Sequence, residues 1–194
     1  ARGGVLPDIC SMAKIVTGGM PGGAVGGREE FMRLLDPTVE FRGQTPGVTH
    51  KGTFNGNPLV AASGVAALSE IKTGKPNKLA DAAAKRLRSG MRQVIEQHQV
   101  TGAVYGEAST FHLYLGDDVK GGSVEGLGAE KIRGIPKSTI SAMQSGLRKR
   151  GADLMSHMSG VTSMAHTEAD VDETLQAFED TIQEMIADGH IGGR

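Results

Sequence analysis

Residues 7–28 read PDICSMAKIVTGGMPGGAVGGR, and this stretch decides the fold of the first part of the chain. Lys14 lies between two apolar pairs and is followed by a glycine-rich stretch over residues 17–23. Short apolar pieces separated by glycines predict strands, here at residues 15–16 and 24–25, joined by a tight loop. An apolar setting keeps water from a lysine amine and favours its neutral, nucleophilic form, as covalent catalysis requires.

Plainer interpretations fit the same residues. From spacing alone, an ordinary surface lysine is the favoured interpretation of Lys14. The glycine loop, taken alone, is more often a structural turn, because it lacks both the Lys-Ser/Thr of a P-loop and a G-x-G-x-x-G register. We expect Cys10, the only cysteine, to be a small buried apolar residue. A single cysteine excludes internal disulfides, and the six histidines lack metal-ligand spacing, so we expect no metal site.

A second segment, KGTFNGNP over residues 51–58, has the composition of an anion-binding turn. Asn57 suits a helix cap and Pro58 the first helical position. Thr53 offers a hydroxyl just before that helix, where backbone N–H groups favour an anion such as phosphate, and Gly52 lets a ligand approach the backbone. A plain turn before a capped helix is the alternative. Considered with Lys14, the segment suggests pyridoxal phosphate as a cofactor.

Apolar periodicity predicts the remaining elements. It indicates helices over residues 28–35, 58–72, 77–99 and 138–149, and a last helix that begins at a Thr167 cap. Strands are predicted at 104–105, 111–115 and 152–155, and a long loop at 116–137. A linker at 74–76 predicts two domains, residues 1–73 and 74–194. We expect His98, at a helix end, and His190, in the tail, to be solvated.

Composition narrows the function classes. The 194 residues carry 21 Lys and Arg against 22 Asp and Glu, a formal net charge of −1, so no basic surface for nucleic acid is indicated. Apolar runs are too short to cross a membrane. Sparing use of cysteine favours a reducing, cytoplasmic location.

Residues 7–28 resemble the cofactor-lysine segment of class III pyridoxal-phosphate aminotransferases, in particular the branch of glutamate-1-semialdehyde 2,1-aminomutases. Residues 52–59, GTFNGNPL, resemble the phosphate segment of that branch. Residues 165–172, AHTEADVD, resemble the start of its C-terminal helix. The three matches follow the family's order and span nearly the whole chain.

The resemblance implies an α/β fold of the PLP-dependent transferase type (fold type I). Residues 1–73 would form the end of the large domain and residues 74–194 the small α+β C-terminal domain. It implies that Lys14 forms the internal aldimine with pyridoxal 5'-phosphate and that Thr53, with Gly52 and Phe54, binds the phosphate. It further implies a homodimer in which Thr53 reaches the partner's site.

The implied activity is amino-group transfer, or a 1,2-amino shift, on a small amino acid or amino aldehyde. The family's other site residues, a phosphate loop, a ring-stacking aromatic and an acid facing the pyridine nitrogen, precede its lysine by more than the 13 residues present here. We therefore expect the chain to be the C-terminal part of such an enzyme. An inactive fragment or interaction module that retains the small-domain fold is the alternative.

Overall fold

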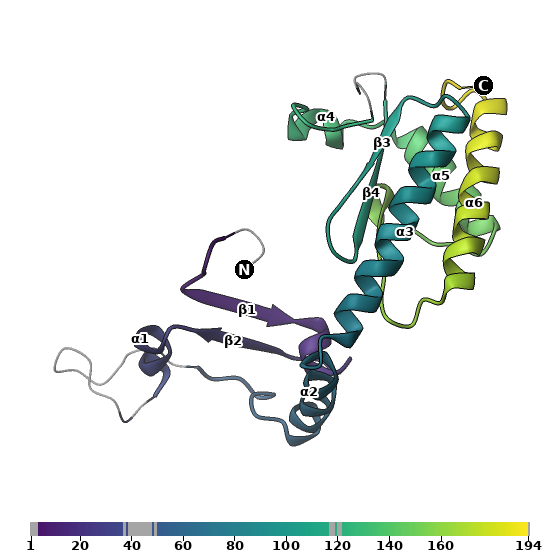
Figure 1. The fold of residues 1–194 in the computed structure, drawn as a ribbon. Coiled ribbons are helices and arrows are strands. Elements are labelled where there is room, and N and C mark those ends of the chain that lie inside the picture. Colours follow the sequence, from purple (N-terminus) through teal and green to yellow (C-terminus); the bar gives the residue numbers. More distant parts are fainter. Residues whose placement is uncertain are drawn as a thin grey trace. The chain divides into compact units, whose positions relative to one another are not determined.

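The chain divides between Thr73 and Gly74 into two compact units, unit 1 (Ala1–Thr73) and unit 2 (Gly74–Arg194). The structure is a computed structural model, and it describes residues 4–36, 38, 48, 50–116, 119 and 122–193. Figure 1 labels the helices and strands of both units. Each unit is described here by itself.

Unit 1 begins with an antiparallel hairpin. Strand β1 (Ile9–Ala13) pairs with β2 (Gly23–Gly27), with Ile9 opposite Gly27 and Ala13 opposite Gly23. Between them lies a short 3-10 turn, η1 (Lys14–Thr17). The strand predicted at residues 15–16 is therefore wrong: pairing ends at Ala13, because Lys14 has φ +57° and leaves the extended conformation. The strand predicted at 24–25 is confirmed as part of β2.

The helices of unit 1 follow the predicted pattern. Residues 29–35 form α1 (Glu29–Met32) and the 3-10 turn η2 (Arg33–Leu35). Helix α2 (Pro58–Ile71) starts with proline at its first turn. The Asn57 side chain caps it by accepting hydrogen bonds from the backbone N–H groups of Leu59, at 3.0 Å, and Val60, at 3.2 Å. Both start signals read from the sequence are confirmed.

Unit 2 begins with α3 (Lys75–Gln97), two residues earlier than predicted. The residue before it, Gly74, is the N-cap of α3 and has φ +72°, a conformation that glycine adopts without strain. Pro76 lies in the first turn of α3, where its missing N–H is not needed, so it opens the helix instead of extending a linker.

Three antiparallel strands of unit 2 form a sheet in the order β3-β4-β5. They are β3 (Gly102–Tyr105), β4 (Thr110–Leu115) and β5 (Ser159–Val161). The predicted strands at 104–105 and 111–115 are confirmed. The one predicted at 152–155 is wrong, because only Met155 bridges Ser159 there and the strand that pairs with β4 comes later.

The other helices of unit 2 are α4 (Ala129–Arg133), α5 (Lys137–Lys149) and α6 (Glu168–Ala187), with a short irregular turn η3 (Ser156–Met158). Helix α4 interrupts the loop predicted at 116–137. Helix α6 has the predicted capping box: Asp170 N–H bonds the Thr167 hydroxyl, and the Asp170 carboxylate accepts the Thr167 N–H at 2.7 Å.

The hydrophobic core described by the structure lies in unit 2. Helix α3 packs along α6 and against strands β3 and β4, and Phe111, Leu113 and Leu115 of β4 are buried in the core. The large side chains buried most completely come from five elements: Met91 of α3, Val104 of β3, Met143 and Leu147 of α5, Met158 of η3, and Phe178, Thr181, Ile182 and Met185 of α6.

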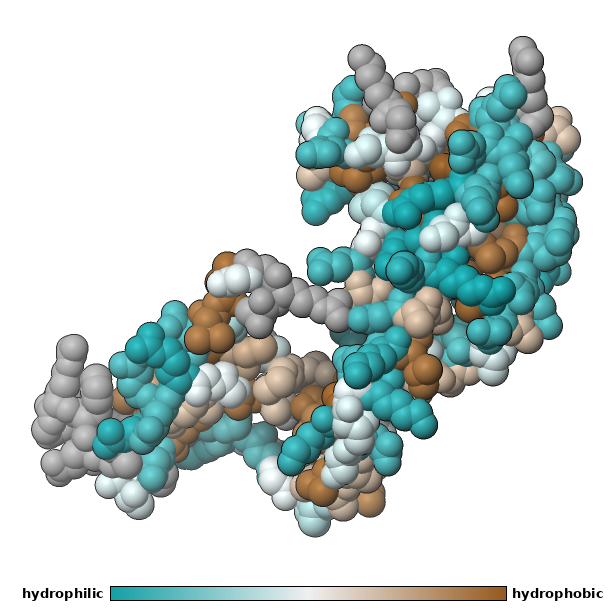
Figure 2. Space-filling view, in the orientation of Figure 1, coloured by the Kyte–Doolittle hydropathy of each residue, from teal (hydrophilic) through white to brown (hydrophobic). Residues whose placement is uncertain are grey.

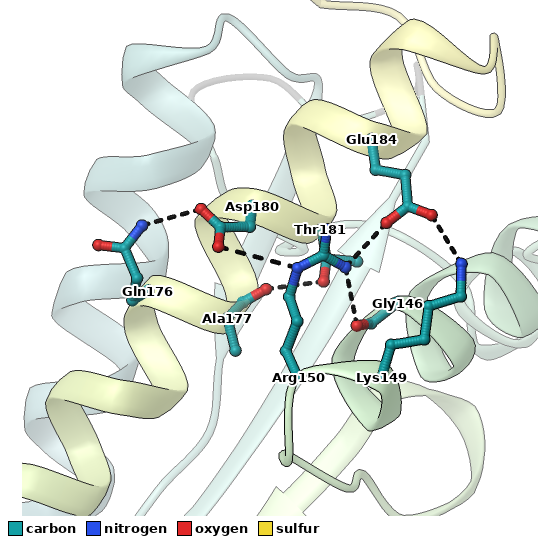
Figure 3. Close-up of polar contacts among 8 residues, drawn as sticks. All are labelled: Gly146, Lys149, Arg150, Gln176, Ala177, Asp180, Thr181 and Glu184. Atoms are coloured by element: carbon teal, nitrogen blue, oxygen red, sulfur yellow. Dashed lines mark hydrogen bonds and ion pairs between the residues drawn. The ribbon is translucent and has the colours of Figure 1, made fainter.

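Helices α5 and α6 approach closely at Gly146, where a Cβ would overlap the buried Thr181 side chain. Arg150 closes this contact, since its Nη1 donates to Gly146 O at 2.9 Å and to Glu184 Oε2 at 2.8 Å (Figure 3). Lys149 Nζ donates to the other Glu184 oxygen at 2.8 Å (Figure 3). One carboxylate of α6 therefore holds two cations of α5.

Candidate functional site

Lys14 lies at the first position of the η1 turn, where the hairpin strand ends. Its φ of +57° is in the left-handed region, which costs a non-glycine residue about 1–2 kcal/mol. Its side chain is exposed, and within the described residues its ammonium group has no hydrogen-bond or ion-pair partner. Strained backbone of this kind persists only where the surrounding structure fixes it, and such residues cluster at functional sites.

The apolar setting expected around Lys14 is not present in the described chain. Ile15 is 66% exposed, and the residues of β1 are exposed along the whole strand. Of the four apolar neighbours that predicted desolvation, three are exposed and only Val16 is half-buried, so the Lys14 side chain remains exposed. Cys10 is exposed for the same reason, so the expectation of a buried cysteine is wrong.

Thr17 closes the Lys14 turn, and sequence reasoning missed it. Its hydroxyl lies 2.6 Å from Met20 O and 3.1 Å from Lys14 O. Gly18 N–H donates to Ile15 O at 3.0 Å, and Met20 N–H donates to Thr17 O at 3.2 Å. Thr17 is 7% exposed. The available signal was a β-branched hydroxyl residue at the start of a glycine run, a position suited to capping a turn.

Helix α2 packs against the turn that carries Lys14. A Cβ at Gly64 would lie 2.9 Å from Val16 O, so the absence of a side chain allows backbone and helix to approach. Ser63 Oγ donates to Gly18 O at 3.2 Å, and Gly18 has φ +63°, which glycine adopts without strain. The turn that carries Lys14 is thus packed on the helix that follows the Thr53 segment.

The Thr53 segment forms two successive turns ahead of α2. Asn55 N–H donates to Gly52 O at 3.0 Å, and Asn57 N–H donates to Phe54 O at 3.3 Å. Thr53 is exposed, and Phe54 is 80% exposed. In the described part of the chain, the Thr53 hydroxyl and the backbone N–H groups of Thr53 and Phe54 have no hydrogen-bond partner.

The cap changes which groups of this segment can hold an anion. Asn57 already accepts the N–H groups of Leu59 and Val60, so these two donors of the helix end are occupied. The donors left for an anion are the Thr53 hydroxyl and the loop amides of Thr53 and Phe54. The helix dipole can still assist them over a short range.

A groove of about 660 Å³ lies between the hairpin, α2 and the segment that precedes α2. Thr17, Gly22, Val25, Phe54, Val60 and Gly64 are among its lining residues. Neither Lys14 nor Thr53 is among the residues that line this groove.

The donor set nevertheless suits pyridoxal phosphate. An exposed primary amine without a partner can condense with an aldehyde, and a hydroxyl with two adjacent amides can bind phosphate oxygens. Among the described residues, no group of three or more His, Cys, Asp and Glu side chains could hold a metal ion. In the same residues, no helix has the length and apolarity that crossing a membrane requires.

The two histidines expected to be solvated differ in their surroundings. His98 Nε2 lies 3.1 Å from Glu179 Oε1, and its side chain is 18% exposed. The expectation of a solvated His98 is therefore wrong, because α6 brings Glu179 against the end of α3. His190 is exposed, as expected.

Comparison with known proteins identifies relatives along nearly the whole chain. The family model described as Aminotransferase class-III matches residues 1–182. A glutamate-1-semialdehyde 2,1-aminomutase from Pyrobaculum aerophilum is 33% identical over 184 residues, which are 94% of this chain and 40% of that protein. The chain thus spans about 40% of the length of the curated relatives it matches.

Solved structures show the same relationship. The crystal structure of an omega-transaminase from Sphaerobacter thermophilus superposes with a TM-score of 0.76 at 29% identity, covering 93% of this chain and 39% of that one. A structure described as a transaminase with PLP bound gives a TM-score of 0.78 at 26% identity, covering 96% of this chain and 40% of that one. The predicted α/β fold of a PLP-dependent transaminase is confirmed.

Proposed function

Because the chain belongs to the class-III aminotransferase family, a family of pyridoxal-phosphate enzymes, we propose that it serves amino-group transfer or a 1,2-amino shift. The substrate class is a small amino acid or amino aldehyde. Unit 1 is the end of a large cofactor-binding domain, and unit 2 is the small C-terminal domain. The observation that carries the proposal is the Lys14 amine, which is exposed and without a described partner on a strained turn packed against α2.

Lys14 is the proposed attachment residue. The cofactor, when bound, supplies an aldehyde for amine attachment and a ring that accepts the electron pair left on the substrate's α-carbon. When the cofactor is bound, Lys14 Nζ would be the atom that holds it. After exchange with the substrate amine, the Lys14 amine would be placed to move the proton of that α-carbon.

Thr53 is the proposed phosphate ligand, together with the backbone of Gly52 and Phe54. The unpartnered hydroxyl and amides of this loop support the role, because charge-assisted hydrogen bonds to phosphate are among the stronger polar contacts. We further propose a homodimer in which Thr53 serves the partner's site. The Thr53 hydroxyl is exposed, and it has no hydrogen-bond partner among the described residues, so it is accessible to a second chain, which supports this role. The proposed location is the cytoplasm.

Hydride trapping tests the role of Lys14. The chain is incubated with pyridoxal phosphate and reduced with borohydride, which fixes the cofactor on the attached amine, and the labelled peptides are quantified by mass spectrometry. We expect Lys14 to be labelled well above the exposed Lys51, which lies in the same unit. Lys14→Ala should remove the dominant label, and Lys51→Ala is the matched control that should leave it.

Two outcomes contradict the proposal. Equal labelling of Lys14 and Lys51 would make Lys14 an ordinary surface lysine. Labelling that stays at its full level in Lys14→Ala would place attachment elsewhere. The first result would favour the alternative in which the chain is an inactive fragment or interaction module.

The names of the relatives point to two reaction types, a 1,2-amino shift and amino-group transfer. The masses of the products distinguish them. The curated relatives are named as aminomutases, whereas the solved relatives are named as transaminases. A 1,2-shift converts an amino aldehyde into an isomer of equal mass without a second amino compound. Transfer requires a second amino compound and changes the mass of both reactants, so incubation of glutamate-1-semialdehyde with and without an added amino donor distinguishes them.

A further inference from the structure

We propose that Thr17 is a positioning residue that fixes Lys14 for cofactor attachment. The inference rests on the proposed function of Lys14 and extends it to a residue that touches neither substrate nor cofactor. Thr17 has the one buried side chain among the described residues of unit 1; the other buried residue there, Gly64, has none. A hydroxyl is buried at little cost only when it is hydrogen-bonded, so its partners define what it does.

Those partners are the two ends of the loop that leaves β1. The Thr17 hydroxyl has a single proton, which it can share between Met20 O at 2.6 Å and Lys14 O at 3.1 Å. The contact with Lys14 is to its backbone carbonyl. The hydroxyl therefore fixes the peptide plane that follows Lys14 and leaves the amine free.

The backbone of Lys14 needs such a restraint. Its φ of +57° is disfavoured for a residue with a Cβ, so without a fixing contact the residue would relax toward negative φ. That change of φ would rotate the Cα–Cβ bond of Lys14, and its side chain would then point in a different direction. The contact with Thr17 acts at the point where the strand ends and the turn begins.

Packing holds Thr17 itself in place. A Cβ at Gly22 would lie 2.9 Å from Thr17 Cγ2, so the methyl group fills the space beside β2. A Cβ at Gly64 of α2 would lie 3.6 Å from Thr17 Cα. Methyl group, backbone and hydroxyl of Thr17 are each in contact, which a surface threonine does not achieve.

Two substitutions separate the hydroxyl from the shape. Thr17→Val keeps the volume and both branches but removes the proton donor. Thr17→Ser keeps the donor but loses the methyl group. If the hydroxyl fixes Lys14, the ratio of cofactor trapped at Lys14 to that trapped at Lys51 should fall about tenfold in Thr17→Val, as expected for one lost hydrogen bond. In Thr17→Ser it should stay within about twofold of the unsubstituted chain.

A third variant tests for general loosening of the hairpin. Arg28 Nη1 bonds Asp8 Oδ1 at 2.9 Å, at the hairpin end opposite the turn. Arg28→Ala removes this polar contact of unit 1 and should leave the trapping ratio unchanged. If Thr17 acted only by stabilising the hairpin in general, Arg28→Ala would also lower the ratio of cofactor trapped at Lys14 to that trapped at Lys51.

The experiment, run on the whole chain with pyridoxal phosphate and borohydride, distinguishes the failures. No preference for Lys14 in the unsubstituted chain overturns the proposed function. A preference that persists in Thr17→Val overturns the positioning role alone. Failure of Thr17→Ser to retain the preference, or its loss in Arg28→Ala, also overturns that role, because the hydroxyl would then not be the operative group.

Discussion

Units 1 and 2 use their apolar residues in opposite ways. In unit 2, α3, α5 and α6 bury leucine, methionine and phenylalanine side chains against the sheet, with Phe178 fully buried. In unit 1, Val5, Leu6, Ile15, Phe54 and Leu59 lie exposed, and Figure 2 shows apolar residues on the surface of its hairpin and of α2. Burial of apolar area is the main source of stability, so unit 2 has the means to stabilise itself and unit 1 has few.

The difference in burial indicates that the residues of unit 2 serve mainly stability, whereas those of unit 1 serve the turn that carries Lys14. Unit 2 has helical periodicity, caps and a core that agree with one another, which is how a sequence specifies a fold. In unit 1, glycines, the buried Thr17 hydroxyl and the strained backbone of Lys14 all lie in one turn, between β1 and β2. We expect substitutions in unit 2 to change stability, and substitutions in unit 1 to change cofactor attachment.

The largest expected effect compares two phenylalanines. Phe178→Ala removes a fully buried ring and should lower the free energy of unfolding of unit 2 by about 3–5 kcal/mol. Phe54→Ala removes a ring of unit 1 that is 80% exposed and should change the free energy of unfolding of unit 1 by less than ~0.5 kcal/mol. Urea unfolding followed by helical circular dichroism measures both. Similar losses would break the comparison.

Thr53→Ala tests the assignment of unit 1, where a substitution should change cofactor affinity and leave stability unchanged. Losing one charge-assisted hydrogen bond to phosphate costs ~1.5–3 kcal/mol, which corresponds to a roughly ten- to hundredfold loss of cofactor affinity. The exposed side chain contributes little packing, so the urea midpoint should not move. Thr53→Ser is the control and should retain most of the affinity. Unchanged cofactor affinity in Thr53→Ala would remove the phosphate role.

A pair of glycines sharpens the comparison within unit 2. Gly146→Ala places a Cβ against the buried Thr181, whose hydroxyl is bonded to Ala177 O (Figure 3). Overpacking of this kind costs ~1–3 kcal/mol, partly offset by the better helix propensity of alanine. Gly192→Ala is the control, because nothing lies within 4 Å of its Cβ position in the exposed tail, and it should be neutral. A Gly146→Ala variant as stable as the parent would show that α5 and α6 are loosely packed.

The smallest expected effect is on acid stability. The backbone N–H and hydroxyl of Thr167 hold the pKa of Asp170 below its usual range, and hydrogen bonds from Lys149 and then Arg150 lower the pKa of Glu184. Because both pKa values are lower in the folded state, their contribution is present above the ordinary values of 3.8 and 4.5. It is lost as pH falls through the folded pKa values.

Thermal unfolding between pH 2 and 6 should therefore show unit 2 losing stability toward acid, with a shallower slope in Glu184→Gln. Glutamine keeps the shape but does not titrate. An identical slope in both proteins would mean that the ion pairs with Lys149 and Arg150 contribute nothing to the acid response.

Much of unit 2 was readable from the sequence, because its signals are local. The Thr167 cap, the stripe ending at Met185 and the alternation from Phe111 to Leu115 each predicted one element. The strand at Ser159–Val161 was missed because its pairing with β4 is long-range and its residues carry no alternation of their own. Registers between distant segments are not set by local propensity.

Unit 1 was readable in its motifs but not in its geometry. Lys14, Thr53 and the Asn57 cap stand out by residue type, and the cap is confirmed. The positive φ of Lys14 and the burial of Thr17 depend on α2 packing against the turn through Gly64, a contact between residues almost fifty positions apart. No window of sequence shows that approach.

The central claim is that the folded turn, and not lysine chemistry alone, makes Lys14 the attachment residue. Hydride trapping with pyridoxal phosphate in buffer and again in 8 M urea, roughly the concentration that unfolds most domains, tests it most directly. We predict that label concentrates on Lys14 in buffer and is spread evenly over Lys14, Lys51 and the other lysines in urea. The same distribution under both conditions would contradict the account.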